Sequence, residues 1–297
     1  MSDIIASPSV RTLAGNRGID LEQLARDLGR TTIGREDLDA RPAQTSAPAR
    51  GAGSDTSYWE VDHSAHGPVH EEPTSRFAQA AARNLGAANA LIPQVTHHDR
   101  ADISAIESLR SSWKADSAAQ GVKLTALAFH VATLARCLTE FPKFNASLSP
   151  DGKTLILKDY VHIGIAVDTP HGLMVPVVRD AGKKGLWQIA GEIAELAGRA
   201  QARKLGPDEM GGASMSISSL GGIGGIGFTP IVNPPEVAIL GITRTETITV
   251  WKGDTPKPVP MVPLDLSYDH RVINGADAAR FLARYAAILA EPRWLMV

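Results

Sequence analysis

The sequence predicts an α/β protein in which a larger domain with a mixed β-sheet follows a small helical unit. Three observations support this prediction. From about residue 58 onward, long stretches with apolar residues at helical spacing alternate with short runs rich in β-branched residues. A run of small and polar residues separates this part from the first 40 residues. With 297 residues, the chain is long enough for one large domain and a smaller one.

The first forty residues are expected to form two helices and one further helical turn. Pro8 suits the first turn of a helix, which Gly18 then breaks. Asp20 is a good N-cap for a second helix, which ends at Gly29. Residues 35–38 suggest one more short turn. The unit is about 35 residues long, which is below the size at which a single core is comfortably stable.

Residues 41–57 are rich in alanine, proline, glycine, serine and threonine and contain hardly any large apolar side chain. Such a composition is typical of a flexible linker. We therefore expect three parts, which are a helical unit at 1–40, a linker at 41–57 and a larger domain at 58–297. The sequence shows no internal repeat.

The larger domain is expected to alternate between helices and strands. Helical periodicity predicts helices at residues 75–90, 103–117, 124–141, 186–205 and 276–290. Short β-rich runs predict strands at residues 92–99, 154–157, 162–169, 173–178, 214–218, 237–242, 247–251 and 259–268. Pro170, His171 and Gly172 separate two of these strands and predict a tight hairpin turn.

Composition excludes several classes of partner. The net charge is −2 at pH 7, and the lysines and arginines are scattered among acidic residues, so we expect no nucleic acid partner. No stretch reaches the ~18 to 20 apolar residues of a membrane span, and the N-terminus does not resemble a signal peptide. Cys137 is the single cysteine, which excludes a disulfide within the chain and fits a reducing compartment. The cytoplasm is the expected location.

Two stretches carry candidate chemistry. Residues 264–281 are expected to change from strand to helix near Gly275, so His270 and Asn274 fall in the connection, where reactive side chains are commonly displayed. An imidazole suits general base catalysis toward a thiol, whose reference pKa is about 8.5. From the spacing alone, however, a histidine that only satisfies a local hydrogen bond is the better interpretation.

The second stretch, residues 211–227, is a hydroxyl-rich strand that runs into a glycine-rich loop. It lacks the pattern of a phosphate-binding P-loop, so we do not expect it to cradle phosphates. The loop is either simply flexible or holds a serine hydroxyl that donates a hydrogen bond to a developing oxyanion.

Together these stretches resemble the dihydrolipoamide acyltransferases, the core components of the 2-oxo acid dehydrogenase complexes. The segment Tyr-Asp-His-Arg-Val-Ile-Asn-Gly at residues 268–275 is similar to the DHRxxDG signature of that family. Residues 225–233 resemble the pyruvate, or acetyl, class. Further similar segments occur in the family's order over nearly all of residues 75–297, and these are residues 92–99, 141–146, 163–177, 216–221 and 230–241.

The resemblance implies a chloramphenicol acetyltransferase-like fold for the catalytic domain. It also implies a homotrimer that assembles into a larger core, with each active site in a channel between neighbouring subunits. An acyl group, expected to be acetyl, would pass between dihydrolipoamide and coenzyme A. The residues that contact coenzyme A are not identified by the sequence. No lipoyl domain is recognised in residues 1–297, so the lipoyl group is expected on another chain or on a segment removed from this one.

Residue roles follow from the same resemblance. His270 is expected to be the general base, and Ser218 the donor to the oxyanion, with Ser219 as the second choice. Asn274 stands where aspartate is more common, and its amide is expected to form a hydrogen bond that fixes the turn. No metal site is expected, because His97 and His98 follow each other on a strand and point to opposite faces.

Residues 6–38 resemble a peripheral subunit-binding domain, although the loop before Ile33 is shorter than the family's usual glycine-rich version. The resemblance implies docking of the 2-oxo acid decarboxylase, the dihydrolipoamide dehydrogenase or both. An electrostatic docking face is one interpretation of the arginines, and a solvated surface is the other. These arginines are Arg11, Arg17, Arg26, Arg30 and Arg35.

Two other functions remain open at this point. One is a scaffold that assembles the complex without catalysing, which Asn274 in place of aspartate would fit. A stand-alone coenzyme A-dependent acetyltransferase of small molecules would have no use for a docking domain. The apolar C-terminus at 294–297 is expected either to anchor trimers to one another or to pack on the chain's own core.

Overall fold

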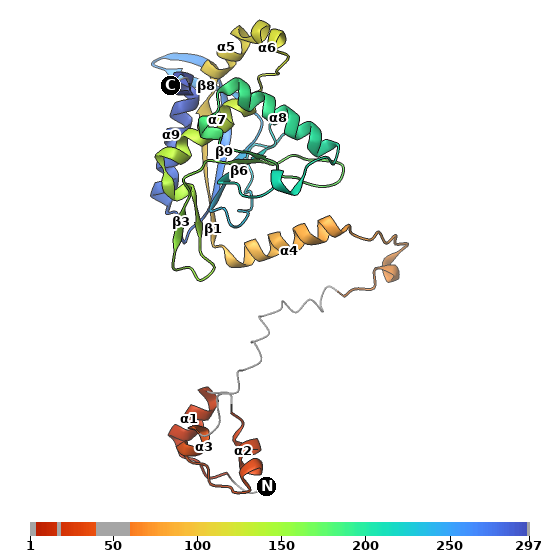
Figure 1. Ribbon diagram of the computed structural model, residues 1–297, viewed down its shortest axis with the longest axis vertical. Coiled ribbons are helices and arrows are strands. Elements are labelled where there is room, and N and C mark those ends of the chain that lie inside the picture. The colour runs from red at the N-terminus through yellow and green to blue at the C-terminus, as the bar shows by residue number, and fades with distance from the viewer. Residues whose placement is uncertain (1–3, 17–18, 40–59, 296–297) are drawn as a thin grey trace. The chain divides into compact units, whose positions relative to one another are not determined.

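The computed structural model describes residues 4–16, 19–39 and 60–295, and the chain divides into two units, residues 1–72 and 73–297 (Figure 1). The predicted linker at 41–57 lies outside the described residues, as do both of its predicted boundaries. Within the ranges that the structure describes, no helix is long and apolar enough to cross a membrane.

The first unit contains the predicted short helices. They are α1 (Pro8–Asn16), α2 (Leu21–Leu28) and α3 (Arg35–Asp39), and a 3-10 helix, η2, follows at His63–His66. Asp20 caps α2 by accepting hydrogen bonds from two backbone N–H groups, and Gly29 ends it with φ of 64°, a conformation that favours glycine. The predicted break at Gly18 lies outside the described residues. A small apolar core holds the unit together, formed by Val10, Ala14, Leu24, Ile33 and Leu38.

The second unit is built on a mixed sheet of seven strands in the order β1-β9-β7-β6-β4-β5, with β8 paired to β9. The pairs β4–β6 and β6–β7 are parallel and the others are antiparallel. A separate two-stranded sheet joins β2 (Ala146–Leu148) to β3 (Leu155–Leu157). The strands of the large sheet are β1 (Gln94–Asp102), β4 (Ile163–Ile165), β5 (Val177–Val178), β6 (Met215–Ser219), β7 (Ala238–Ile242), β8 (Glu246–Lys252) and β9 (Thr255–Asp269).

Helices cover one face of this sheet (Figure 1). Leu264, Leu266 and Tyr268 of β9 share a single buried core with Phe129 and Phe281 of the covering helices. Because side chains alternate along a strand, the residues between them point to the opposite side, which we call the second face. The covering helices are α5 (Ser104–Ser112), α7 (Ala126–Glu140), α8 (Leu186–Gln201) and α9 (Gly275–Ala290).

Part of the second face is covered by α4 (Arg76–Leu91), which Ser75 caps. Ala88 of this helix, with Ile92 and Val232, packs against Ile239 of β7. Ile239 alternates with the core residues Ala238 and Leu240, so this small cluster lies on the side of the sheet away from the main core.

The helix predicted at 103–117 is in fact two helices. The chain ends α5 before Trp113 and continues as α6 (Lys114–Gln120). The Trp113 ring packs against the main core, and its centroid lies 5.8 Å from that of Trp187. Periodicity alone does not reveal such a break, because the apolar spacing continues across it.

The strand predictions at 162–169 and 173–178 were too long, although the hairpin between them is correct. Beyond β4 and β5 only an isolated bridge joins Val167 to Met174, and the backbone N–H of Gly172 donates to the Thr169 carbonyl oxygen at 3.0 Å. Strand β2 was missed, since three residues are too few to show a periodic pattern.

Strand β9 begins earlier than predicted and runs through Pro256, Pro258 and Pro260. The Pro260 carbonyl accepts from the Ile103 N–H, so the backbone groups of Pro260 point away from β8. The other two prolines, at alternate positions, point the same way. No ladder donor toward β8 is therefore lost, which explains why prolines are tolerated here.

At the C-terminus, Leu295 packs against the main core, whereas Trp294 remains 43% exposed. The Arg284 guanidinium lies 4.9 Å above the ring of Trp294. Residues 296–297 lie outside the described part of the chain.

Close packing between β4 and β6 leads to a prediction. A Cβ atom added at Gly164 would lie 2.3 Å from Ser216 Oγ and 3.0 Å from Val175 Cγ1. The substitution Gly164→Ala should therefore lower the free energy of unfolding by about 1–3 kcal/mol, measured by urea titration. Gly198 of α8 has open space around it, so Gly198→Ala should be neutral or stabilising. Equal losses in the two variants would contradict the packing argument.

Candidate functional site

His270 lies in the connection between β9 and α9, where the sequence placed it. Its backbone N–H donates to the Pro93 carbonyl oxygen at 3.2 Å. The backbone N–H groups of Val272 and Ile273 both donate to the Asp269 carbonyl oxygen, which closes a tight turn. The imidazole is exposed, and its ring centroid lies 5.7 Å from that of Tyr268. A strand, a turn and a helix thus present this ring at the surface of the single chain.

An ion pair brackets His270. The buried carboxylate of Asp269 accepts hydrogen bonds from Arg271, at 2.6 Å from Nη2 and 2.9 Å from Nε. It also accepts from the Arg271 backbone N–H. These bonds raise the pKa of the Arg271 guanidinium. Because both neighbours of His270 are tied together, the backbone that carries the imidazole is held in one conformation.

Asn274 is the N-cap of α9. Its side-chain oxygen accepts a hydrogen bond from the backbone N–H of Asp277 at 2.8 Å. This is the turn-fixing hydrogen bond expected for the amide. Asparagine is among the best N-cap residues, so the helix that follows His270 starts at a defined point.

Ser218 and Ser219 lie at the end of β6 and point to opposite faces of the sheet. Met215 and Ile217 of this strand are in the main core, so Ser216 and Ser218 lie on the second face. Ser218 is half-buried, whereas Ser219 is exposed. The two candidate hydroxyls therefore cannot replace each other geometrically.

Glu236 is a buried carboxyl group that sequence reasoning did not single out. Its Oε1 accepts a hydrogen bond from Ser216 Oγ at 2.9 Å. Burial raises its pKa from 4.5 to about 7, although the Ser216 hydrogen bond and the charge of Lys158 act in the opposite direction. The sequence offered no signal for this, since a glutamate after two prolines is usually exposed.

Sheet register shows how far Ser218 lies from His270 within one chain. Ser218 pairs with Gly241, and Gly241 pairs with Asp265, which precedes His270 by five positions on β9. Two strand spacings and five residues of extended chain amount to about 20 Å. The single chain therefore does not bring the predicted base and the predicted oxyanion donor together.

The same register places Ser218, Gly241, Asp265 and His98 side by side on the second face. His98 Nδ1 lies 2.6 Å from Asp265 Oδ1. From the sequence, His98 is a candidate only for metal binding. Among the residues that the structure describes, no group of three His, Cys, Asp or Glu side chains could hold a metal ion.

The surroundings of two other histidines and of the cysteine indicate structural roles. His130 is buried beside Tyr285, 2.8 Å from its hydroxyl, and burial lowers the pKa of His130 to about 4. His162 Nδ1 accepts from the Asp180 backbone N–H at 2.9 Å. Burial raises the pKa of the Cys137 thiol to about 12, which makes this thiol a poor nucleophile.

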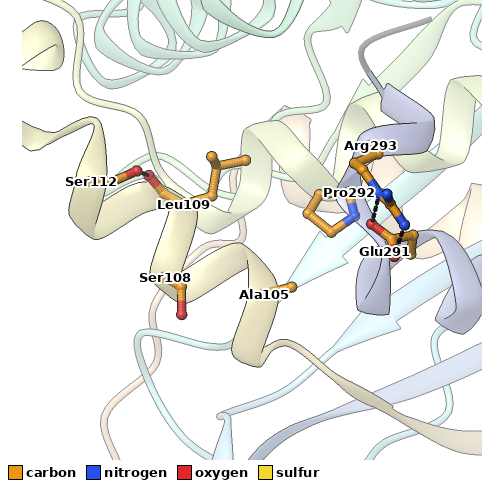
Figure 2. A pocket seen from close by; sticks show the side chains of 7 residues that line it. All are labelled: Ala105, Ser108, Leu109, Ser112, Glu291, Pro292 and Arg293. Atoms are coloured by element: carbon orange, nitrogen blue, oxygen red, sulfur yellow. Dashed lines mark hydrogen bonds and ion pairs between the residues drawn. The ribbon is translucent and has the colours of Figure 1, made fainter.

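Two pockets of the single chain lie away from the predicted site residues. Figure 2 shows a pocket of about 470 Å³ between α5 and the residues after α9. Its only charged residues are Glu291 and Arg293, which form an ion pair at 2.6 Å. A second pocket, of about 340 Å³, lies between α7 and the residues around Trp294. Neither is lined by His270, Ser218 or Asn274.

In the N-terminal unit, internal contacts hold the described arginines. The Arg11 side chain donates to the carbonyl oxygens of Ile4 and Ala6. Arg30 pairs with Asp37. Arg26 donates to Gln23 at 2.9 Å, and Arg35 lies 4.0 Å from Asp39. Arg17 lies outside the described residues.

Residues 66–297 match the family model described as 2-oxoacid dehydrogenases acyltransferase (catalytic domain). A similar curated protein is the dihydrolipoyllysine-residue acetyltransferase component of the pyruvate dehydrogenase complex of Pseudomonas aeruginosa. It is 46% identical over 299 residues, which cover 98% of this chain and 55% of that protein. The chain thus spans about half the length of this relative.

Two solved structures are similar to the chain, each with 50% identity, a TM-score of 0.78, and coverage of 80% of this chain and 98% of the solved one. One is the cubic core of the pyruvate dehydrogenase multienzyme complex. The other is the dihydrolipoamide acetyltransferase of Azotobacter vinelandii, studied for the roles of a serine, a histidine and an asparagine in its catalytic mechanism. The expected α/β fold with a mixed sheet is confirmed.

The buried carboxyl of Glu236 predicts a pH-dependent stability. As the pH rises, the unfolded state loses this proton near pH 4.5 and the folded state only near pH 7. The free energy of unfolding therefore falls as the pH rises from about 4.5 to about 7, and this loss remains at higher pH. From pH 4 to pH 8, Glu236→Gln should gain up to about 3 kcal/mol relative to the parent in urea unfolding.

Glu195→Gln, on the exposed surface of α8, is the matched control and should show little dependence on pH. A Glu236→Gln effect of the same size at both pH values would contradict a neutral buried carboxyl.

Proposed function

This chain belongs to the family of 2-oxoacid dehydrogenase acyltransferase catalytic domains, and we propose that it passes an acetyl group between the thiols of dihydrolipoamide and coenzyme A. One observation carries the proposal. The serine and histidine studied in the Azotobacter vinelandii acetyltransferase are 52 positions apart, and the asparagine follows four positions later. Ser218, His270 and Asn274 have the same identities and the same spacings.

We assign the general base to His270. Its exposed imidazole would take the proton from the attacking thiol while the sulfur bonds to the thioester carbonyl carbon. The tetrahedral intermediate then collapses, the original carbon–sulfur bond breaks, and His270 returns the proton to the departing thiolate. The Asp269–Arg271 ion pair would keep the imidazole in place during both steps.

We assign the oxyanion donor to Ser218 and a positioning role to Asn274. One thioester replaces another in this reaction, so the free energies of reactants and products are similar. What the site must supply is orientation and stabilisation of the negative oxygen. The Ser218 hydroxyl is suited to the second task. The Asn274 cap supports the first, because it sets where α9 begins after His270.

The proposed reaction needs at least two copies of the chain. About 20 Å separate Ser218 and His270 within one copy, so the hydroxyl that faces a given imidazole would come from a neighbour. A homotrimer with shared sites, assembled into a larger core, satisfies this requirement. The cubic core formed by a relative supports such an assembly.

We further propose that residues 6–38 dock the decarboxylase or the dihydrolipoamide dehydrogenase of the complex. The Arg11 guanidinium is held by backbone carbonyl oxygens within the unit, which gives its charge a defined position and favours electrostatic recognition. The lipoyl group would arrive on a lipoyl domain outside residues 1–297.

Three alanine variants test the assignment of site residues. His270→Ala and Ser218→Ala should each lower kcat for coenzyme A-dependent transfer with free dihydrolipoamide by about 100- to 1,000-fold, because each removes a group that acts in the transition state. Ser219→Ala, on the opposite face, should stay within about threefold of the parent. If wild type shows no transfer, the chain is a scaffold. If Ser219→Ala is the inactive variant, the oxyanion assignment is wrong.

Deleting residues 1–52 tests the docking proposal. The truncated chain should lose binding to the decarboxylase and the dihydrolipoamide dehydrogenase in a pull-down, since it lacks the arginine-bearing unit. Transfer with free dihydrolipoamide should remain at the parent level, because the site residues all lie beyond residue 215. Unchanged binding of both enzymes would contradict the docking role.

A further inference from the structure

Asp265 is a buried carboxylate with two hydrogen-bond donors. Its side chain is only 2% exposed and lies on the second face of the sheet. Oδ1 lies 2.6 Å from His98 Nδ1, and Oδ2 accepts from the backbone N–H of Phe228 at 3.1 Å. A carboxylate in such a position is strongly unfavourable without partners. The side chain of Asp265 is thus held from two sides, by the His98 ring and by the backbone N–H of Phe228.

These bonds attach the glycine-rich segment, residues 221–229, to the sheet. At Gly227 an added Cβ would lie 3.3 Å from Asp265 Oδ1, so the backbone passes close to the carboxylate. The ring of the next residue, Phe228, lies directly against Gly241, where an added Cβ would be 2.7 Å from Cε1. Glycine at position 241 therefore leaves the space that the phenyl ring fills.

Phe228 thereby becomes a neighbour of Ser218 in the sheet. Ser218 is paired with Gly241, and Gly241 with Asp265. Since Gly241 has no side chain, the Phe228 ring occupies the second face between Ser218 and Asp265. The position of this ring, and with it one wall beside the Ser218 hydroxyl, depends on the hydrogen bond that the Phe228 N–H donates to Asp265.

His98 completes the arrangement from the next strand. Its side chain is 57% exposed, and it lies three strands away from Ser218 in the same row, about 14 Å. It is thus too far from that hydroxyl to act on the same carbonyl group within one chain. Its contribution is to hold the Asp265 side chain through the 2.6 Å contact between His98 Nδ1 and Asp265 Oδ1.

We propose that Asp265 and His98 are positioning residues for acyl transfer, which act by fastening Phe228 and the glycine-rich segment beside Ser218. This inference rests on the proposed function, and it adds two residues that touch neither thiol. A hydrogen-bonded chain links solvent-exposed His98, buried Asp265 and the Phe228 backbone, and the Phe228 ring extends it to the serine.

Variants of the full-length chain test the role. Asp265→Ala should lower kcat/KM for transfer by about 10- to 100-fold, because a displaced wall misorients the thioester. Asp265→Asn keeps an acceptor for the Phe228 N–H and should restore most of the activity. His98→Ala should act in the same direction, and the double alanine variant should be little worse than Asp265→Ala, since the two residues form one unit.

Thr96→Val is the matched control. Thr96 Oγ1 and Ser267 Oγ lie 2.7 Å apart, on the same two strands and the same face as the His98–Asp265 pair, one row away. Loss of this cross-strand bond should leave transfer within about twofold of the parent. A loss in Thr96→Val equal to that in Asp265→Ala would reduce the effect to general weakening of the β1–β9 pairing and overturn the proposal.

Hydrogen exchange of the Phe228 amide separates this inference from the proposed function. The amide should exchange faster in Asp265→Ala than in the parent or Thr96→Val, whatever the activity. If the parent shows no transfer but exchange changes, the acyltransferase assignment fails and the fastening of Phe228 stands. If the parent is active and Asp265→Ala retains both full activity and a protected Phe228 amide, the positioning role is wrong.

Discussion

The side-chain alternation of β9 is the constraint on which the larger unit depends. Leu264, Leu266 and Tyr268 enter the core, while Asp265, Ser267 and Asp269 emerge on the second face. This strand pairs with β1, β7 and β8, so it sets the register of most of the sheet. A slip of one residue would drive these three polar side chains into the core and remove three apolar ones from it. The same register delivers His270 at the end of the strand, directly after a carboxylate that holds Arg271.

The proposed chemistry is therefore divided between two rigid elements. His270 directly follows the end of β9, and Ser218 lies at the end of β6. Strand β7 lies between these two strands. Neither can approach the other without breaking the sheet. Under the proposed function, the reaction centre would form only through association of copies, and assembly and activity would then be coupled. The rigidity of each copy would then determine how accurately the imidazole of one copy and the serine hydroxyl of another are placed relative to each other.

Sequence reasoning succeeded where structure is local. The helices ending at Leu91 and Ala290 follow from apolar spacing, and the connection carrying His270 and Asn274 follows from the change between two periods. It failed where contacts between segments distant in the sequence determine the structure. The break at Trp113 lies where its ring meets Trp187 of α8, and the tolerance of prolines in β9 depends on which edge they face. The pair of His98 and Asp265 joins positions 167 residues apart, so only the sheet register reveals it.

The prolines of β9 also bear on solubility. Their nitrogens line the outer edge of the β8–β9 hairpin, where an extended strand would normally offer amide donors to any passing chain. At Pro256 and Pro258 this edge has carbonyl oxygens but no N–H donors, so a foreign strand cannot complete a ladder of hydrogen bonds against it. The prolines thus protect this part of the chain from open-ended growth through an unpaired sheet edge.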